Sequence, residues 1–174
     1  MSPISRAAAL LLGALALAAC QRGGGSDQAS SQASGQASGG ATQPAPAPAP
    51  VPEAAKPYLA QLPASYAHAD LDNGRLHFNL CKPCHTVASG APNMTGPNLY
   101  GVFGRKVASQ PGFDYSPALK AKDWTWDEAH LDQWLKSPRS YVPGTRMSFY
   151  GIPDNEDRRD LIAYLKVASS GGPM

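Results

Sequence analysis

Residues 81–85 read Cys-Lys-Pro-Cys-His, which brings two thiols and an imidazole close together in the chain. Three chemistries use such a cluster: thiol–disulfide exchange, zinc binding and covalent attachment of a haem. An exchange motif is expected beside a βαβ pattern, which this sequence lacks. A structural zinc site needs four ligands, and no second Cys/His pair follows at comparable spacing. The spacing therefore favours a haem c, with thioethers from Cys81 and Cys84 and with His85 directed at the iron.

A single motif of this kind predicts one haem, whose second axial ligand must come from elsewhere in the chain. Of the four methionines, Met1 lies in the leader and Met174 is the last residue. Met94 follows the motif closely, and chain reach alone leaves it open as a ligand. Met147 lies much further along, in the Pro/Gly-bounded segment VPGTRMSFYG. We predict that Met147 binds the iron opposite His85, because a haem needs a lid and this segment has no other reason to be ordered.

The elements that must position this motif are predicted to be short helices. One helix should begin near Asp70–Asp72 and lead into the cysteines. A second, over residues 116–120, opens with Ser-Pro, a cap residue followed by proline at the first helical position. Thr125 and Glu128 have the form of a capping box, which predicts a third helix that stops at Ser137-Pro138.

The last helix should start between Asp154 and Asp157, where acidic side chains suit the helix dipole, and end before Gly171. No run shows the alternation of a strand, so we predict an all-α domain of about four short helices. The loops over residues 86–112 and 138–153 are long for so small a domain. Such loops indicate that a large apolar body lies within them.

The first twenty residues are typical of an export signal. Arg6 is followed by the apolar run AAALLLGALALAAC, which is too short to span a bilayer of roughly 30 Å. The end of this run, Leu-Ala-Ala-Cys, is similar to a bacterial lipobox, so we expect Cys20 to be lipidated and to become the mature N-terminus. Two alternatives stay open: ordinary signal cleavage nearby, which leaves a free thiol, and an uncleaved hydrophobic anchor. Each of them places the domain outside the cytoplasm.

Residues 21–56 read as a linker, so the predicted organisation is a signal over 1–20, this linker, and one domain over 57–174. Its first part is rich in Gly, Ser and Gln and cannot bury enough apolar surface to fold. Its second part alternates Ala and Pro and favours stiff polyproline II, so the two parts should span about 25 and 30 Å.

The domain is nearly neutral: from residue 57 onward there are 12 basic residues and 11 acidic ones. No basic stripe with interleaved aromatics occurs, which argues against nucleic-acid binding.

From about Asn73 to Lys166 the sequence resembles the mitochondrial-type class I cytochromes c and their bacterial relatives, here in a membrane-anchored lipoprotein form. The segments that carry the resemblance occur in the family's order and spacing: CKPCHTV, GPNLYGVFGRK, PGFDYSP, the second Trp of DWTWDE, VPGTRM and DLIAYLK. The resemblance implies the class I cytochrome c fold around one covalently bound haem. It also implies thioethers at Cys81 and Cys84, with His85 and Met147 as axial ligands.

Further roles follow from the same resemblance. The Pro97 carbonyl should accept a hydrogen bond from the axial histidine, which orients the ring. The haem propionates should be held by Arg105, Tyr115 and Trp126, since a buried carboxylate needs such donors. Phe149 should lie beside the haem edge.

The sequence also departs from the family pattern. Trp134 stands where a tyrosine is frequent, and its indole can donate a hydrogen bond but cannot accept one. Leu119 replaces a usual asparagine, which should make that interior drier. The lysines that commonly surround the haem edge are few, so long-range steering toward an acidic partner should be weak. A tether could offset this weakness by raising the effective concentration.

Together these features predict a monohaem electron carrier, not an enzyme, because a six-coordinate iron leaves no position for substrate. Methionine opposite histidine raises the potential. This suits a monomeric carrier from a quinol-oxidising cytochrome bc complex to a terminal oxidase, held by Cys20 on the periplasmic side of a membrane. Alternatives are a haem module dedicated to a dehydrogenase or to photosynthetic electron donation. A haem peroxidase or reductase fits less well, since no distal His-plus-Arg pattern is present.

Overall fold

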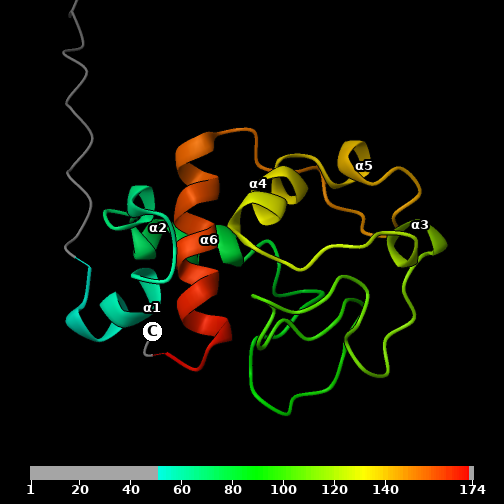
Figure 1. Ribbon diagram of the computed structural model, residues 1–174, viewed down its shortest axis with the longest axis horizontal. Coiled ribbons are helices and arrows are strands. Elements are labelled where there is room, and N and C mark those ends of the chain that lie inside the picture. The colour runs from blue at the N-terminus through cyan, green and yellow to red at the C-terminus, as the bar shows by residue number, and fades with distance from the viewer. Residues whose placement is uncertain (1–50, 173–174) are drawn as a thin grey trace, which may run out of the picture. The chain divides into compact units, whose positions relative to one another are not determined.

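The computed structural model describes residues 51–172, and these residues form helices joined by long loops (Figure 1). The expected signal peptide, Cys20 and the linker up to residue 50 lie outside the described residues. Within 51–172 there is no β-strand, only an isolated antiparallel bridge between Lys106 and Thr125. The helical elements are η1 Glu53–Ala55, α1 Lys56–Leu59, η2 Ala64–Tyr66, α2 Leu71–Phe78, α3 Pro117–Lys120, α4 Glu128–Lys136, α5 Pro138–Tyr141 and α6 Asn155–Ser169. The predicted all-α class is confirmed.

Short polar side chains set the starts of the main helices. The carboxylate of Asp70 accepts hydrogen bonds from two backbone N–H groups at the start of α2, and Asp154 does the same for α6. The Ser116 hydroxyl caps α3, followed by proline as predicted. The predicted capping box on Thr125 is wrong. The cap of α4 is Asp127, whose carboxylate accepts from the His130 N–H at 2.8 Å.

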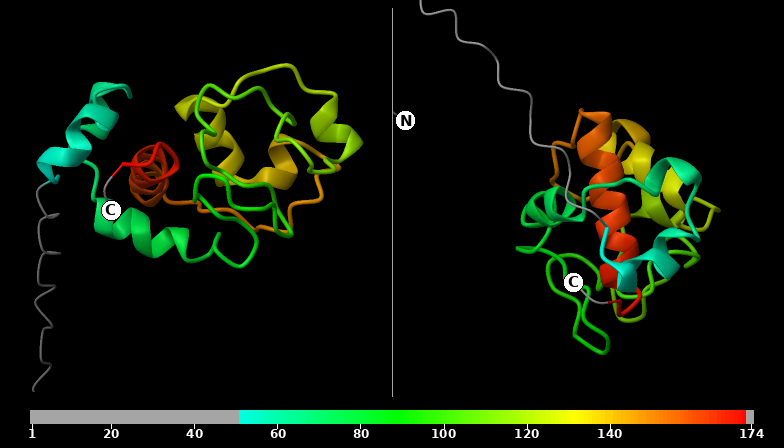
Figure 2. Two further views of the ribbon diagram at one scale, coloured as in Figure 1. Left: turned by 90° about the horizontal axis from the view of Figure 1, so that it is seen from below. Right: turned by 90° about the vertical axis from the view of Figure 1, so that its left-hand side faces the viewer.

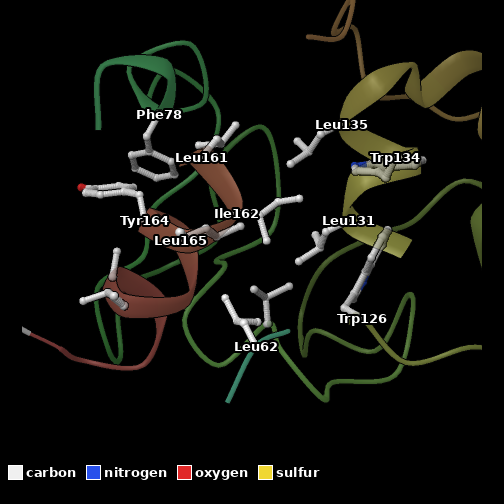
Figure 3. Close-up of a cluster of buried hydrophobic side chains, with 14 of the residues drawn as sticks. Leu62, Phe78, Trp126, Leu131, Trp134, Leu135, Leu161, Ile162, Tyr164 and Leu165 are labelled. Atoms are coloured by element: carbon white, nitrogen blue, oxygen red, sulfur yellow. The ribbon is translucent and has the colours of Figure 1, made fainter. Parts of the chain in front are cut away.

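The centre of the fold is the crossing of α2 and α6. A Cβ atom on Gly74 would lie 2.2 Å from the Asp160 carbonyl oxygen, so only glycine lets the two backbones approach this closely. Phe78 packs on Tyr164 with ring centroids 5.4 Å apart. Figure 3 shows Leu161 and Ile162 of α6 pointing toward the apolar side chains of α4. These contacts fix α2, and with it the start of the segment that carries the cysteines.

Arg158 ties the start of α6 to its neighbours. The residue is 2% exposed, and its Nε donates to Asp132 of α4 at 2.8 Å. Its Nη1 also donates to the backbone carbonyls of Ile152, Pro153 and Asp154. A buried charge needs such partners, and here they hold the chain that returns from the loop of Met147.

Four helical turns were not predicted from the sequence pattern: η1, α1, η2 and α5. Residues 53–56, at the end of the expected linker, already fold as η1 and the first residue of α1, and Ala55 is fully buried. Pro138, expected to end a helix, also starts the single turn of α5. Among the described residues, no helix is long and apolar enough to cross a membrane.

Candidate functional site

A cavity of about 470 Å³ lies among α2, α3, α4, α6 and the loops between them. Its size falls in the range of cofactor and ligand pockets in general, about 300–1,000 Å³. Most of its wall is apolar. The structure brings to this one wall all nine residues to which the sequence analysis assigned a haem role: Cys81, Cys84, His85, Pro97, Arg105, Tyr115, Trp126, Met147 and Phe149.

The cysteines and the histidine sit on a helical turn that directly follows α2. The N–H groups of Cys84 and His85 both donate to the Cys81 carbonyl, at 3.0 and 2.9 Å. The two thiols are not joined to each other. Burial, and secondarily the neighbouring Cys84, raises the pKa of Cys81 to about 11. Since the thiolate is the nucleophile, this environment does not suit disulfide exchange.

The His85 imidazole is held from one side by the loop after it. Its Nδ1 lies 2.8 Å from the Pro97 carbonyl oxygen, the contact that the resemblance implies. Burial lowers the pKa of His85, and the Pro97 hydrogen bond opposes this shift more weakly. A neutral ring that donates through Nδ1 keeps the Nε2 lone pair available for a metal.

Gly96 and Asn98 support this arrangement, and the sequence analysis missed both. A Cβ atom on Gly96 would lie 2.3 Å from Cε1 of His85, so any side chain there would displace the ring. The Asn98 amide, 3% exposed, donates to the carbonyls of Ala88 and Ala91 at 2.9 and 2.8 Å, which closes the loop after the histidine. The one available signal was the Gly-Pro-Asn sequence itself, because loop residues carry no periodic pattern.

Arg105 brings a positive charge to the cavity wall. Its guanidinium donates to the carbonyls of Asn98 and Tyr100, at 3.0 and 3.1 Å, and to the side chain of Gln110. Within residues 51–172 it makes no ion pair with a carboxylate. The Gln110 N–H donates to the Tyr115 hydroxyl at 3.3 Å, so Arg105 and Tyr115, two of the three predicted propionate donors, meet at this residue. A half-buried guanidinium with only neutral partners is suited to an incoming anion.

Met147 lies on a loop that is fixed at both ends. On one side Arg146 pairs with Asp114 at 2.9 Å. On the other, the Ile152 N–H donates to the Leu135 carbonyl at 2.8 Å. Gly151 has φ +100°, and a Cβ atom there would lie 2.1 Å from the Lys136 carbonyl, so the turn requires glycine. The alternative ligand Met94 is 47% exposed and is not among the residues that line the cavity.

The two departures from the family pattern also lie on the cavity wall. Trp134 and Leu119 are both buried, and Trp134 contacts Trp126 with ring centroids 5.6 Å apart. An apolar wall there excludes water from the side of the cavity formed by α3 and α4.

The donor set fits a haem better than a bare metal ion. Nowhere in residues 51–172 do three or more His, Cys, Asp or Glu side chains gather into a group that could hold a metal. By contrast, a single apolar cavity is lined by the thiols of Cys81 and Cys84, the oriented imidazole of His85, the side-chain sulfur of Met147, and the Arg105 guanidinium, which makes no ion pair within the described residues. This fold and this donor set define a c-type haem protein.

Comparison with known proteins agrees with this class. Residues 71–169 match the model of the cytochrome c family, and the chain belongs to that family. It is 45% identical to cytochrome c2 of Rhodomicrobium vannielii over 102 residues, which cover 59% of this chain and 82% of that protein. It is 39% identical to cytochrome c of Kluyveromyces lactis over 105 residues, 60% of this chain and 96% of the relative. Among solved structures, cytochrome cH from Methylobacterium extorquens aligns with a TM-score of 0.53 and 44% identity, covering 56% of this chain and 98% of that one.

The family membership confirms three predictions: the class I cytochrome c family, its all-α fold and its cofactor. The protein carries one covalently attached haem c and is a monohaem electron carrier. The roles of the individual residues remain predictions, which the cavity makes specific enough to test.

Proposed function

We propose that this protein is a membrane-tethered carrier that takes single electrons from a quinol-oxidising cytochrome bc complex and delivers them to a terminal oxidase. The observation that carries the proposal is that His85 and Met147 line the same cavity, while Met94 does not. Two protein ligands on one iron leave no position for a substrate, so transfer of an electron is the chemistry that remains.

The bound haem supplies a one-electron Fe(III)/Fe(II) couple, whose potential a methionine ligand raises. The residues of the chain support that couple in three ways. The Pro97 carbonyl orients the His85 ring. Arg105 and Tyr115 offer hydrogen-bond donors to the propionates. The apolar wall keeps water away, so little has to rearrange when the charge changes.

The face beside the cysteines and Phe149 would meet the redox partners. Leu80, which lines the cavity next to Cys81, is 60% exposed, and Tyr150, next to Phe149, is 98% exposed. Several basic side chains near the cavity are already paired with carboxylates: Lys120 and Arg146 both with Asp114, and Lys106 with Asp123. We therefore expect contact through apolar side chains and a weak dependence of electron transfer on ionic strength.

The tether would offset this weak steering. The export signal and the lipobox-like sequence that ends in Cys20 support a lipid anchor on the periplasmic side, from which a monomeric domain reaches both complexes. Holding the carrier near its partners raises its effective concentration without any new contact.

The deciding experiment mixes reduced protein with membranes of the source cell and follows the haem absorbance. Oxidation should be blocked by cyanide, and reduction should be blocked by an inhibitor of the quinol-oxidising complex. Reduction by a specific dehydrogenase, or oxidation only under illumination, would contradict the proposed partners and favour a dedicated haem module. Rapid binding of carbon monoxide by the reduced protein would reveal an open iron site and contradict the carrier function itself.

A further inference from the structure

Residues 51–70 precede the part of the chain that matches the cytochrome c family, which begins at residue 71. They nevertheless fold, as η1, α1, η2 and the turns between them. One residue in every three or four is buried along this segment, namely Ala55, Leu59, Leu62, Tyr66 and Ala69. We call residues 51–70 the strap.

The strap covers a face of α6 that the haem cavity does not reach. Leu161 and Leu165 line the cavity. Ala163 and Val167 lie two residues further along, about 200° away around the helix. They should therefore be exposed in a helix that packed only against the cavity, yet they are 0% and 1% exposed.

Besides α2, whose crossing with α6 is described above, and α4, two segments of the strap, α1 and η2, pack against α6. Figure 2 shows α6 between the strap on one side and the loops that carry the cavity on the other. A carbon placed on Gly172 would lie 2.8 Å from a Val167 methyl group and 2.9 Å from the ring of Tyr58. Tyr58 of the strap therefore reaches the same place as the Val167 side chain.

Hydrogen bonds hold the strap along its length. Successive turns are closed by Leu62 N–H to the Leu59 carbonyl and by Tyr66 N–H to the Pro63 carbonyl, both at 2.9 Å. At its end, the Asp70 N–H donates to the carboxylate of Asp160 on α6 at 3.1 Å. The strap is thus a docked part of the domain and not the loose end of a linker.

We propose that the strap fixes the point at which the tether joins the domain, on the face of α6 opposite to the haem cavity. The tether then pulls on the back of the domain and leaves the face beside Leu80 and Tyr150 free for partners. A linker that entered directly at Leu71, the first residue of α2, would lack this fixed attachment on the back of α6. This inference rests on the proposed tethering for its biological meaning, but its geometry can be tested separately.

The geometry is tested with a nitroxide attached to a single introduced cysteine in the haem-loaded full-length protein. Cys20→Ser supplies a background without another reactive thiol. Ala54→Cys places the label on the exposed side of the strap, and Tyr150→Cys places it beside the predicted haem edge. The ferric haem should shorten the spin relaxation of the label far more at residue 150 than at residue 54. Equal relaxation, or a freely tumbling label at residue 54, would overturn the proposal.

The docking is tested with two neighbouring substitutions. Leu59→Asp buries a charge against α6, whereas Ala60→Asp places the same charge in solvent. Cleavage by chymotrypsin after the buried Tyr66 should accelerate at least about tenfold in Leu59→Asp and stay at the native rate in Ala60→Asp, since proteolysis follows the opened population. The haem spectrum should be unchanged in both. If Leu59→Asp does not mature, Leu59→Ala takes its place with a smaller acceleration expected.

Native protein that is cut at Tyr66 as fast as Leu59→Asp would overturn the docked strap.

The function of the strap is measured on membranes. Release of the strap by Leu59→Asp should lower electron delivery by the anchored protein, because the tether lengthens and its direction is lost, yet leave reduction of a small soluble acceptor unchanged. Unchanged delivery with a released strap would overturn the proposed role. A native protein that washes off membranes with salt would contradict the tethering instead, while the label measurement would still report on the strap.

Discussion

At the scale of single residues, a few contacts fix the orientation of the side chains that line the cavity. The Pro97 carbonyl selects which nitrogen of His85 faces the cavity, and Gly96 leaves room for the ring beside it. Arg105 stands on the wall with neutral partners only. The first two groups orient the histidine, and Arg105 is the group that we predict pairs with the negative charges of the haem.

Replacement of Met147 by Ala should keep the haem attached, because the thioethers at Cys81 and Cys84 are untouched. The reduction potential should fall and the reduced iron should bind carbon monoxide, since one axial ligand is lost. Met94→Ala is the matched control and should change neither property, because Met94 does not line the cavity. Redox titration and carbon monoxide difference spectra measure both effects. A loss of ligation in Met94→Ala alone would show that the wrong methionine was assigned.

Gly96→Ala should disturb the haem ligation although residue 96 carries no ligand. The new methyl group would lie 2.3 Å from the His85 ring, so the ring must tilt or the loop must move. We expect a lower yield of haem-loaded protein and an altered spectrum of the axial ligands. Gly90→Ala is the control: at φ +72° it adds backbone strain that Gly96→Ala does not, but no atom lies within 4 Å of the added carbon. Identical spectra for native protein and Gly96→Ala would refute the steric argument.

At the scale of elements, sequence patterns predicted the helix starts that depend on hydrogen bonds between residues close together in the chain. Helices α2, α3 and α6 begin where a short polar side chain can accept backbone N–H groups, and those residue types are visible in the sequence. The start of α4 was placed wrongly because Thr125 and Asp127 are both good caps. Thr125 instead forms the bridge with Lys106, a contact that no local pattern reveals.

The strap and α5 escaped prediction for a related reason. The helical turns of the strap (η1, α1 and η2) and α5 are each only three or four residues long, too short for a helical period, and the tertiary contacts that stabilise such turns cannot be read locally. The haem residues were predictable as a group because the C-x-x-C-H spacing and the resemblance place them. Asn98 and Gly96 were not, since their roles depend on how one loop folds back on another.

The stability of α6 should depend on pH through its cap. Backbone hydrogen bonds from Asp157 and Glu156 hold the pKa of Asp154 below its ordinary value. A carboxyl group whose pKa is depressed by folding stabilises the folded state above its unfolded pKa, and this contribution is lost as the pH falls through the folded pKa. Asp154→Ala should therefore lower the melting temperature at pH 7.

The difference between Asp154→Ala and native protein should shrink as the pH falls below the usual aspartate range. Asp154→Asn, which keeps an acceptor oxygen without a charge, should give a smaller loss at pH 7 and a weaker pH dependence. Circular dichroism melts over a pH series measure all three proteins. A difference that stays constant down to the lowest pH would show that the cap acts without its charge.

At the scale of the whole molecule, we expect long-range electrostatic attraction to partners to contribute little. The charges of residues 57–174 nearly cancel, and Asp114 pairs with two basic side chains, Lys120 and Arg146, whose positive charge it partly offsets. The two cations lower the pKa of Asp114 to about 2, so this pairing persists over the physiological range. We therefore propose that this carrier depends on its location, which the tether would supply.

Cys20→Ser, with another cleavable export signal supplied, should release the protein from the membrane with an unchanged haem spectrum. Electron delivery in whole cells should fall because the local concentration is lost, whereas transfer by the purified protein should stay the same. Fractionation, spectroscopy and oxygen uptake measure these outcomes. An unmodified thiol at Cys20 in the native protein, seen by mass spectrometry, would contradict the lipid anchor.

The contact between Gly172 and Tyr58 has a consequence for engineering. It brings the end of the described chain against the strap near its beginning, behind the face that partners would use. A few added residues could therefore join the two ends and yield a circularly permuted cytochrome, opened instead at the exposed turn after α3. Likewise, a protein wired to an electrode through either end should present its haem edge to the solution.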